Sequence, residues 1–264
     1  MINSSTELEN LHVSPTDANP MLPSVPSSVV YNEDCVEGLK RFHDGYFDLA
    51  ICDIPYGINV GKMAYLKETK TTVKQKNGTR LNGNKNKEVY TKKDWDKEPP
   101  TQEYFDELKR VSKEQIIFGI EYVNWQGVGT GRIKWNKGVA EGMSFKQYEL
   151  AYCSMIDEEI ELPLLWAGMC QAKSLSEPMT QQGNKRLNEK RIHPCHKPTL
   201  LYQKLIADYG FEGCKILDTH VGSGSSRIAA KKANCEYIGF EIDTEYYDKQ
   251  EKRFNDFKSQ LRLF

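Results

Sequence analysis

The sequence predicts an α/β fold with a doubly wound, mostly parallel sheet, and three observations support that prediction. Short apolar runs alternate with segments whose apolar residues recur at helical spacing, from about residue 29 to residue 257. The run Phe47–Cys52 is apolar except for Asp48, as expected for a strand covered on both faces. A chain of 264 residues with 39% apolar content can bury the core of one large α/β domain.

The expected elements follow in order from the same patterns. An apolar triplet at 29–31 predicts the first strand, and Val36, Leu39 and Phe42 then share one helical face. A helical stripe at 104–111 precedes a third apolar run. By the same criteria we expect further strands at 115–119, 132–135, 148–153, 216–217 and 237–240, and helices at 200–206, 227–233 and 247–257.

Three segments fall outside this alternation. Residues 1–28 are rich in Ser, Asn and Pro and lack a periodic apolar face, so we expect a mobile tail before one domain at 29–264. Residues 61–93 carry ten Lys and Arg against two Glu, and we expect a basic loop there. Residues 157–191 are irregular and end in a basic stretch. Compact domains rarely keep loops of this length without using them.

Charge and cysteine content bear on the setting of the protein. Lys and Arg total 36 against 37 Asp and Glu, so the net charge of -1 neither favours nor excludes a nucleic-acid partner. The seven cysteines are scattered and form no Cys-x-x-Cys pair, which fits a reducing compartment. Neither a secretory signal nor an apolar stretch of membrane length is evident, so we expect a soluble cytoplasmic protein.

A carboxylate and an aromatic ring follow the strand at 47–52. Asp53-Ile54-Pro55-Tyr56 places them around a rigid bend at the carboxyl end of that strand. The Asp53 carboxylate and the Ile54 carbonyl can accept the two N–H bonds of an amino group, while Tyr56 stacks on a flat ring that carries this group. When both N–H bonds are accepted, the lone pair of the nitrogen becomes available for attack. Positioning and electrostatics then supply most of the catalysis. The alternative is that the tetrapeptide only ends a strand in a turn.

A glycine loop, Asp218–Ser225, follows a later strand. Gly222 and Gly224 allow close approach of the backbone to a nucleoside, and Glu241 ends the next strand, where ribose-binding acids lie in such folds. A nicotinamide dinucleotide would need a third glycine where this chain has Arg227, so it fits poorly. The structural alternative is a tight turn without a ligand.

Two further groups of residues have more than one interpretation. Asp34 precedes the first helix and can approach a cofactor, cap the helix, or do both. His193, Cys195 and His196 have a spacing that could hold zinc. No second ligand pair is evident, so we expect no metal.

The two motifs together, with Asp53–Tyr56 first and Asp218–Ser225 last, resemble the defining motifs of the permuted, beta-class amino-methyltransferases of DNA. The resemblance extends from Val29 to Phe257. It implies a seven-stranded, Rossmann-like methyltransferase sheet in circularly permuted order, with S-adenosylmethionine as the cofactor. Because relatives in this class are often dimers, a homodimer is a further expectation.

The resemblance also assigns individual residues and shows two departures. Asp34 is expected near the cofactor adenine, and Lys197-Pro198 matches the family motif before the cofactor-side helix. The family usually has Phe where this chain has His220, and Pro where it has Ile54. His220 still offers a ring face, and the backbone carbonyl of Ile54 survives the change. We therefore expect both halves of the site to be retained, with an altered rate of transfer.

Basic residues near the catalytic motif indicate double-stranded DNA as the partner. A loop that follows Tyr56 would lie over the mouth of the pocket and anchor phosphates. A run of charged residues is usually only a solvated surface. The position of this basic loop beside the Asp53–Tyr56 motif favours contact with DNA instead. Residues 157–191 are the candidate insertion for reading target bases. The residues expected to contact DNA are Lys62, Lys67, Lys74, Lys76, Arg80, Lys185 and Arg186.

Within the family, Asp at the first motif position is typical of adenine N6 enzymes and Ser of cytosine N4 enzymes. The resemblance therefore implies methylation of a flipped adenine within a specific DNA sequence. Cytosine N4 methylation is one alternative, and a DNA-binding relative inactivated through Ile54 and His220 is another. Methylation of RNA or of a protein amide is a third. A phage or restriction–modification setting is implied by the resemblance alone.

Overall fold

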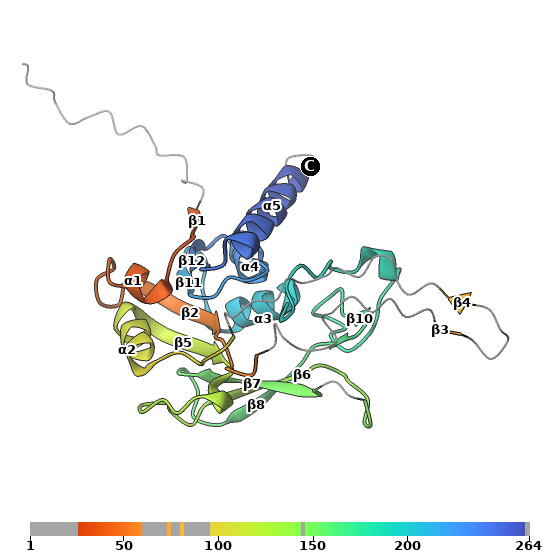
Figure 1. Cartoon of the computed structure of the whole chain (residues 1–264), viewed down its shortest axis with the longest axis horizontal. Coiled ribbons are helices and arrows are strands. Elements are labelled where there is room, and N and C mark those ends of the chain that lie inside the picture. The colour runs from red at the N-terminus through yellow and green to blue at the C-terminus, as the bar shows by residue number, and fades with distance from the viewer. Residues whose placement is uncertain (1–25, 60–72, 75–79, 82–95, 144–145, 262–264) are drawn as a thin grey trace, which may run out of the picture.

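The structure is a computed structural model, and it describes residues 26–59, 73–74, 80–81, 96–143 and 146–261. One eight-stranded sheet lies at its centre, with helices on both faces (Figure 1). The elements in chain order are β1 (Ser28–Tyr31), α1 (Cys35–Leu39), β2 (Phe47–Asp53), β3 (Val73–Lys74), β4 (Arg80–Leu81), α2 (Gln102–Val111), β5 (Ser112–Phe118), η3 (Ile120–Tyr122), β6 (Arg132–Asn136), β7 (Tyr148–Cys153), β8 (Glu159–Pro163), β9 (Trp166–Ala167), β10 (Cys170–Gln171), η4 (Lys185–Leu187), α3 (Thr199–Tyr209), β11 (Lys215–Asp218), α4 (Ser225–Lys232), β12 (Glu236–Phe240) and α5 (Thr244–Leu261).

The strand order of the main sheet is β1-β12-β11-β2-β5-β7-β6-β8. Five of its seven pairings are parallel, and β7 runs antiparallel to both of its neighbours. The chain passes from β11 through α4 to β12 on one side, and from β2 through α2 to β5 on the other. The direction of winding therefore changes between β11 and β2.

Side chains of β2 alternate between two hydrophobic cores, one on each face of the sheet. Leu49 and Ile51 belong to the core that contains residues of α3 and α4, whereas Ala50 and Cys52 belong to the core that contains residues of α1 and α2. All four are at most 2% exposed. Full burial of a large aliphatic side chain contributes roughly 1.5–3 kcal/mol. The strand that ends at Asp53 is therefore held firmly on both faces.

The predicted doubly wound, mostly parallel α/β sheet is confirmed. The sheet has eight strands rather than seven, because β8 pairs with β6 at its far edge. β8 lies within 157–191, which we expected to be irregular. Ile160 and Leu162 alternate with glutamates there, and this period-two pattern is too short to stand out in the sequence. The circular permutation that the resemblance implies stays a prediction.

Ser28 marks the start of the ordered sheet, one residue before the predicted domain boundary. Residues 1–25 of the expected tail lie outside the described residues. Arg227, which is buried in α4, donates from Nε to Ser28 Oγ and from Nη2 to the Ser28 carbonyl, both at 3.0 Å. The first strand is thus fastened to a helix near the other end of the chain. In the described parts of the chain, no helix combines the length and apolarity needed to cross a membrane.

Candidate active site at the carboxyl edge of the sheet

A cavity of about 250 Å³ opens at the carboxyl edge of the sheet, beside the paired strands β2 and β11. In open α/β sheets, the point where winding changes direction leaves a crevice for ligands. Both predicted motifs line this cavity, with residues 53–56 on one side and residues 219–223 on the other. Glu241, directly after β12, also lines it. The fold thus joins two motifs that are far apart in the sequence.

Asp53 ends β2, and its side chain is 14% exposed. Its Oδ1 atom accepts a hydrogen bond from the Tyr56 hydroxyl at 2.9 Å and pairs with Lys197 Nζ at 2.5 Å. Burial raises the pKa of the Asp53 carboxyl above its usual range, although the Lys197 charge opposes that shift. Both contacts use one oxygen, and a carboxylate has a second oxygen with which to accept an N–H bond from a ligand.

Lys197 connects Asp53 to a second buried acid, Glu149 on β7. Lys197 Nζ is 3.0 Å from Glu149 Oε2, and Lys137 Nζ is 3.0 Å from Glu149 Oε1. Burial raises the pKa of Glu149, but the two lysines outweigh it and hold that pKa at about 2. We call Asp53, Tyr56, Lys137, Glu149 and Lys197 the Lys197 cluster. Lys197 lines the cavity, and its ammonium lies beside Asp53; contact between Lys197 and the cofactor stays a prediction.

Further contacts hold Tyr56 in place besides the hydrogen bond of its hydroxyl to Asp53. Its ring stacks on Tyr122 with centroids 4.7 Å apart and an interplanar angle of 12°. Its backbone N–H and that of Gly57 both donate to Asp96 Oδ1, at 2.7 and 2.9 Å. Gly119 has a φ of +85°, and a Cβ there would lie 2.1 Å from the Tyr56 ring. Gly119 is therefore required both for its own backbone conformation and for the position of Tyr56.

Ile54 replaces the proline that is usual in the related motif, and its side chain fills the core rather than the site. It is 2% exposed and packs in the hydrophobic cluster that contains residues of α1 and α2. Ile54 and Pro55 both line the cavity. The substitution is thus accommodated by packing, and it leaves the backbone of the motif at the cavity wall.

Glu241 and Gly222 are joined at the opposite end of the cavity. Glu241 Oε2 accepts the Gly222 N–H at 2.8 Å, and Oε1 accepts the Asp243 N–H at 2.9 Å. Burial raises the pKa of Glu241 to about 7, against the effect of these two hydrogen bonds. Gly222 has a φ of +52°, which is a conformation that favours glycine. A carboxylate and a glycine turn therefore face the same space, as the sequence predicted.

His220 and Asp34 both line the cavity, each with a structural role as well. The His220 ring packs edge-on against Tyr104 at 5.5 Å, and its Nδ1 is 2.9 Å from Thr219 Oγ1. Burial lowers the pKa of His220 to about 4, so the ring is neutral at pH 7. Asp34 Oδ1 accepts the N–H groups of the first turn of α1, so the helix-cap interpretation is correct and the side chain also reaches the cavity.

Four residues expected to bind the cofactor do not line the cavity: Pro198, Asp218, Gly224 and Ser225. Asp218 lies beneath the glycine loop, where its carboxylate accepts from the His220 N–H at 3.0 Å and from Ser226 Oγ at 2.5 Å. Burial raises the pKa of Asp218 to about 6. Gly224 precedes α4 with a φ of +72°. These positions shape the loop rather than face the cavity.

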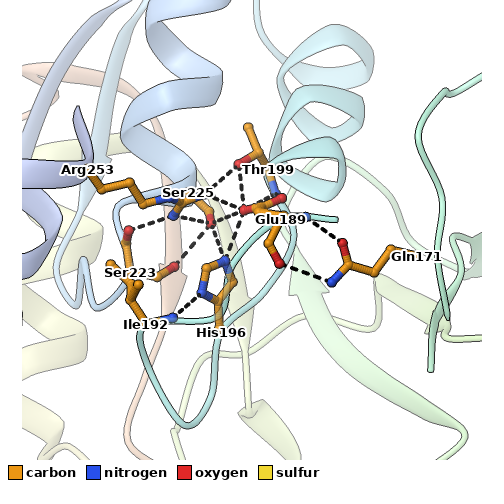
Figure 2. Close-up of polar contacts among 8 residues, drawn as sticks. All are labelled: Gln171, Glu189, Ile192, His196, Thr199, Ser223, Ser225 and Arg253. Carbon is orange, nitrogen blue, oxygen red and sulfur yellow. Dashed lines mark hydrogen bonds and ion pairs between the residues drawn. The ribbon is translucent and has the colours of Figure 1, made fainter. Parts of the chain in front are cut away.

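Ser225 belongs to a separate buried cluster centred on Glu189, shown in Figure 2. Glu189 Oε1 accepts from Thr199 Oγ1 at 2.9 Å and from Ser225 Oγ at 3.2 Å, and it pairs with Arg253 and with His196 Nε2. We call these five residues the Glu189 cluster. None of them lines the cavity. The cluster ties the end of the 157–191 insertion to the starts of α3 and α4 and to α5.

The two histidines whose spacing could hold zinc lie in different parts of the structure. His193 lines the cavity and packs against the Tyr246 ring at 4.3 Å, whereas His196 lies in the Glu189 cluster. Burial lowers the pKa of His193 to about 3. Among the residues that the structure describes, no group of three or more His, Cys, Asp or Glu side chains could hold a metal ion.

The residues expected to contact DNA lie mostly outside the described residues. Lys62, Lys67 and Lys76 are among those not described, and Lys74 and Arg80 are placed only as backbone, in the two-stranded sheet β3–β4. The base of the loop is described: the Asn59 N–H donates to the Asp96 carbonyl at 3.0 Å, close to the attachment of Tyr56. Lys185 and Arg186 begin η4 and are exposed.

The structure also reveals cavity and cluster residues that sequence reasoning missed. They are His193, Cys195, Asp96, Tyr246 and Glu149. Only the proximity of His193 and Cys195 to the Lys197-Pro198 motif could have pointed to any of them. Asp96 and Tyr246 come from separate elements, and nothing in their local sequence indicates a site.

The fold and the cavity define a class of protein, an α/β protein with a ligand crevice where the winding reverses. Residues 134–252 match the model of the N6/N4 methyltransferase family, which is described as DNA methylase. Over this range the chain is similar to the DNA methylases, which confirms the resemblance seen in its motifs. The matched range includes Glu149, Lys197 and Glu241 but ends short of the Asp53 motif.

Several curated bacterial relatives are type II methyltransferases. M.HpaI of Haemophilus parainfluenzae is 36% identical over 74 residues, which is 26% of this chain and 24% of the relative. M.HinfI of Haemophilus influenzae is 23% identical over 273 residues, covering 88% of this chain and 69% of the relative. For three relatives that are 35–38% identical over the matched residues, the match spans about a quarter of the relative's length. The solved PvuII DNA methyltransferase (cytosine-N4-specific) aligns with a TM-score of 0.49 at 12% identity, covering 87% of this chain and 88% of that chain.

Proposed function

We propose that this protein transfers a methyl group from S-adenosylmethionine to the exocyclic N6 of a flipped adenine in a specific sequence of double-stranded DNA. One observation carries the proposal: Asp53 and Tyr56 share a single cavity with Glu241 and the Gly222 turn. The relation to DNA methylases supports the reaction class. Type II methyltransferases among the relatives support a restriction–modification setting.

The residues at the Glu241 end fit the adenosine part of the cofactor. Each Glu241 oxygen accepts one backbone N–H, and a carboxylate oxygen has a further lone pair for a ribose hydroxyl. Gly222 keeps the backbone close to the cavity, while Ile242 and the neutral His220 ring supply apolar walls for a purine. Asp34 would approach the adenine from α1. When bound, the cofactor supplies an electrophilic methyl group on a sulfonium sulfur.

The residues at the Asp53 end fit the target amino group. Asp53 and the Ile54 carbonyl would accept its two N–H bonds, and the Tyr56 ring would stack on the base through the face that Tyr122 does not cover. With both N–H bonds accepted, the lone pair of the amino nitrogen would be free to take the electrophilic methyl group that a bound cofactor would supply. Asp53, a carboxylate that lines this cavity, would take up the proton that the amino nitrogen loses. Positioning supplies most of the rate.

The position of Asp53 and Tyr56 in a cavity bears on how a DNA partner would bind. A base inside a duplex cannot reach a cavity lined by Asp53 and Tyr56, so it must be flipped out. Asn59 and Asp96, the described residues that flank the basic segment 61–93, are hydrogen-bonded to each other, and Asp96 also accepts the Tyr56 N–H. We infer that this segment holds phosphates and that residues 157–191, with Lys185 and Arg186, read the target sequence.

Adenine is favoured over cytosine because the first motif residue is Asp. Cytosine N4 methylation stays the closest alternative, since both bases present an amino group beside an unprotonated ring nitrogen. The second alternative is a DNA-binding relative without activity. The burial of Ile54 in the core weakens that alternative, because the departure from the usual motif is absorbed by packing. A cytoplasmic setting and a homodimer stay predictions.

The test is transfer of labelled methyl from S-adenosylmethionine to unmethylated genomic DNA, followed by separation of the nucleosides. Label in N6-methyladenine is the expected result. Label in N4-methylcytosine would move the proposal to the cytosine alternative. Cofactor binding without label on any DNA would contradict the proposed transfer, and tight DNA binding without cofactor affinity would support the inactive relative.

A further inference from the structure

We propose that Lys197 and Glu149 are positioning residues for the methyl transfer: Lys197 holds the Asp53 carboxylate ionised, and Glu149 shares the ammonium so that Asp53 remains free to accept the target amino group. This inference rests on the function proposed above. It goes beyond the motif because neither residue belongs to the Asp53–Tyr56 tetrapeptide.

The hydrogen bonds of Lys197 carry the first step. An ammonium has three donors, and Lys197 Nζ has three acceptors: Asp53 Oδ1 at 2.5 Å, Glu149 Oε2 at 3.0 Å and the Tyr56 hydroxyl at 3.1 Å. The side chain is 4% exposed, and the Phe118 ring lies 4.9 Å from Nζ. Water therefore contributes little to its solvation, and its charge acts directly on the two acids.

The sharing of Lys197 between two acids carries the second step. If Asp53 were the only acid paired with the ammonium, its carboxylate would be a poorer acceptor for the N–H bond of the target amino group. Glu149 competes for the same ammonium, and Lys137 neutralises the other Glu149 oxygen at 3.0 Å. The cluster thus contains two acids and two lysines. In this proposal the positive charges keep Asp53 ionised, while its second carboxylate oxygen stays available to accept the target N–H bond.

The charges around Asp53 predict opposite consequences for two variants. Lys197 and Glu149 face Asp53 directly, Lys137 acts from behind Glu149, and Asp218 acts from β11. Tyr56, Cys195 and Tyr202 are neutral neighbours whose own pKa values are raised by burial. Loss of the Lys197 charge disfavours the Asp53 carboxylate, whereas loss of the Glu149 charge favours it.

The experiment measures single-turnover methyl transfer against pH for Lys197→Met and Glu149→Gln. We expect the acidic limb of the Lys197→Met profile to move to higher pH, with transfer at pH 7 reduced about tenfold or more and partly recovered at alkaline pH. We expect the limb of Glu149→Gln to move to lower pH, with a plateau reduced several-fold because Lys197 then binds Asp53 alone. Lys197→Arg should restore part of the wild-type profile.

Lys137→Met is the matched control, because it removes one lysine of the same cluster without a contact to Asp53. Its limb should move less than that of Lys197→Met. Cofactor affinity, measured by calorimetry, and the melting temperature report whether each variant is intact. Shifts of Lys197→Met and Glu149→Gln in the same direction, or equal shifts for Lys197→Met and Lys137→Met, would overturn the inference. Failure of the proposed function is distinguishable, because the wild-type protein would then transfer no methyl at any pH.

Discussion

The Glu189 cluster and the Lys197 cluster contain consecutive residues of the chain, His196 and Lys197, but only the Lys197 cluster faces the cavity. His196 belongs to the Glu189 cluster, whereas its neighbour Lys197 belongs to the Lys197 cluster. The first is closed among helices α3, α4 and α5 (Figure 2), and the second lies at the cavity. Buried acids alone therefore do not identify an active site, and we expect the acid that faces the cavity to be the one that takes part in chemistry.

The two acids also differ in how fully they are stabilised. Burial raises the pKa of Glu189, but hydrogen bonds and the charges of His196 and Arg253 outweigh it and hold that pKa at about 2. Burial prevails at Asp53, whose pKa is raised in spite of Lys197. A fully satisfied carboxylate stabilises the fold, whereas an incompletely satisfied one can still gain a partner. The comparison predicts that the first cluster controls stability and the second controls activity.

Asp53→Ala should have the largest effect on activity. It removes the acceptor for the target amino group, and we expect transfer to fall about thousandfold or more. Lys197 keeps Glu149 as a partner in this variant, so unfolding should be little affected. Cofactor affinity by calorimetry should stay within about twofold, because Glu241 is untouched. Equal loss of affinity and transfer would show that the two halves of the cavity are wrongly assigned.

Gly119→Ala tests the catalytic side without touching a charge. The new Cβ would lie 2.1 Å from the Tyr56 ring at a φ of +85°, so the ring must move. A displacement of about 1 Å can lower a rate about hundredfold. We expect a loss of that order in single-turnover transfer with cofactor affinity retained. Gly127→Ala is the matched control, since its Cβ meets nothing within 4 Å and its φ of +112° imposes a similar backbone strain.

Glu189→Gln tests the closed cluster. It leaves Arg253 buried without its anionic partner, and we expect the free energy of unfolding to fall by about 3 kcal/mol. The Glu189 pKa of about 2 lies below the ordinary 4.5, so its contribution is complete above pH 4.5 and is lost as the pH falls toward 2. Denaturant titrations across that window should show less pH dependence in the variant. A variant that is stable but inactive would break the comparison.

Glu241→Gln should have the smallest effect, on cofactor affinity. Because the Glu241 pKa is raised to about 7, its ionised and more strongly accepting form increases as the pH rises through 7. We therefore expect the wild-type affinity for S-adenosylmethionine to rise between pH 6 and 8. The variant should bind about tenfold more weakly at pH 8, with a flat profile. A pH-independent wild-type affinity would argue against contact between Glu241 and the ribose.

Much of the fold was predictable because each strand and helix carries its own periodic pattern. The run at 47–52 and the stripe at 104–111 became β2 and α2, with both faces of β2 buried. β8 escaped prediction because only Ile160 and Leu162 mark it, and its partner β6 lies more than twenty residues away. Strand pairing of this kind depends on tertiary contacts that local pattern does not encode.

The sequence by itself determined the two motifs and their meeting at one edge of a parallel sheet, because strands that end in Asp53 and Asp218 must present those ends together. Only the tertiary structure decided which charges act on Asp53. Lys197 and Glu149 come from a loop and a distant strand, and their effect depends on separations of about 3 Å in a site with little water. Coulomb energies at that range depend on distance and burial, which a sequence does not specify.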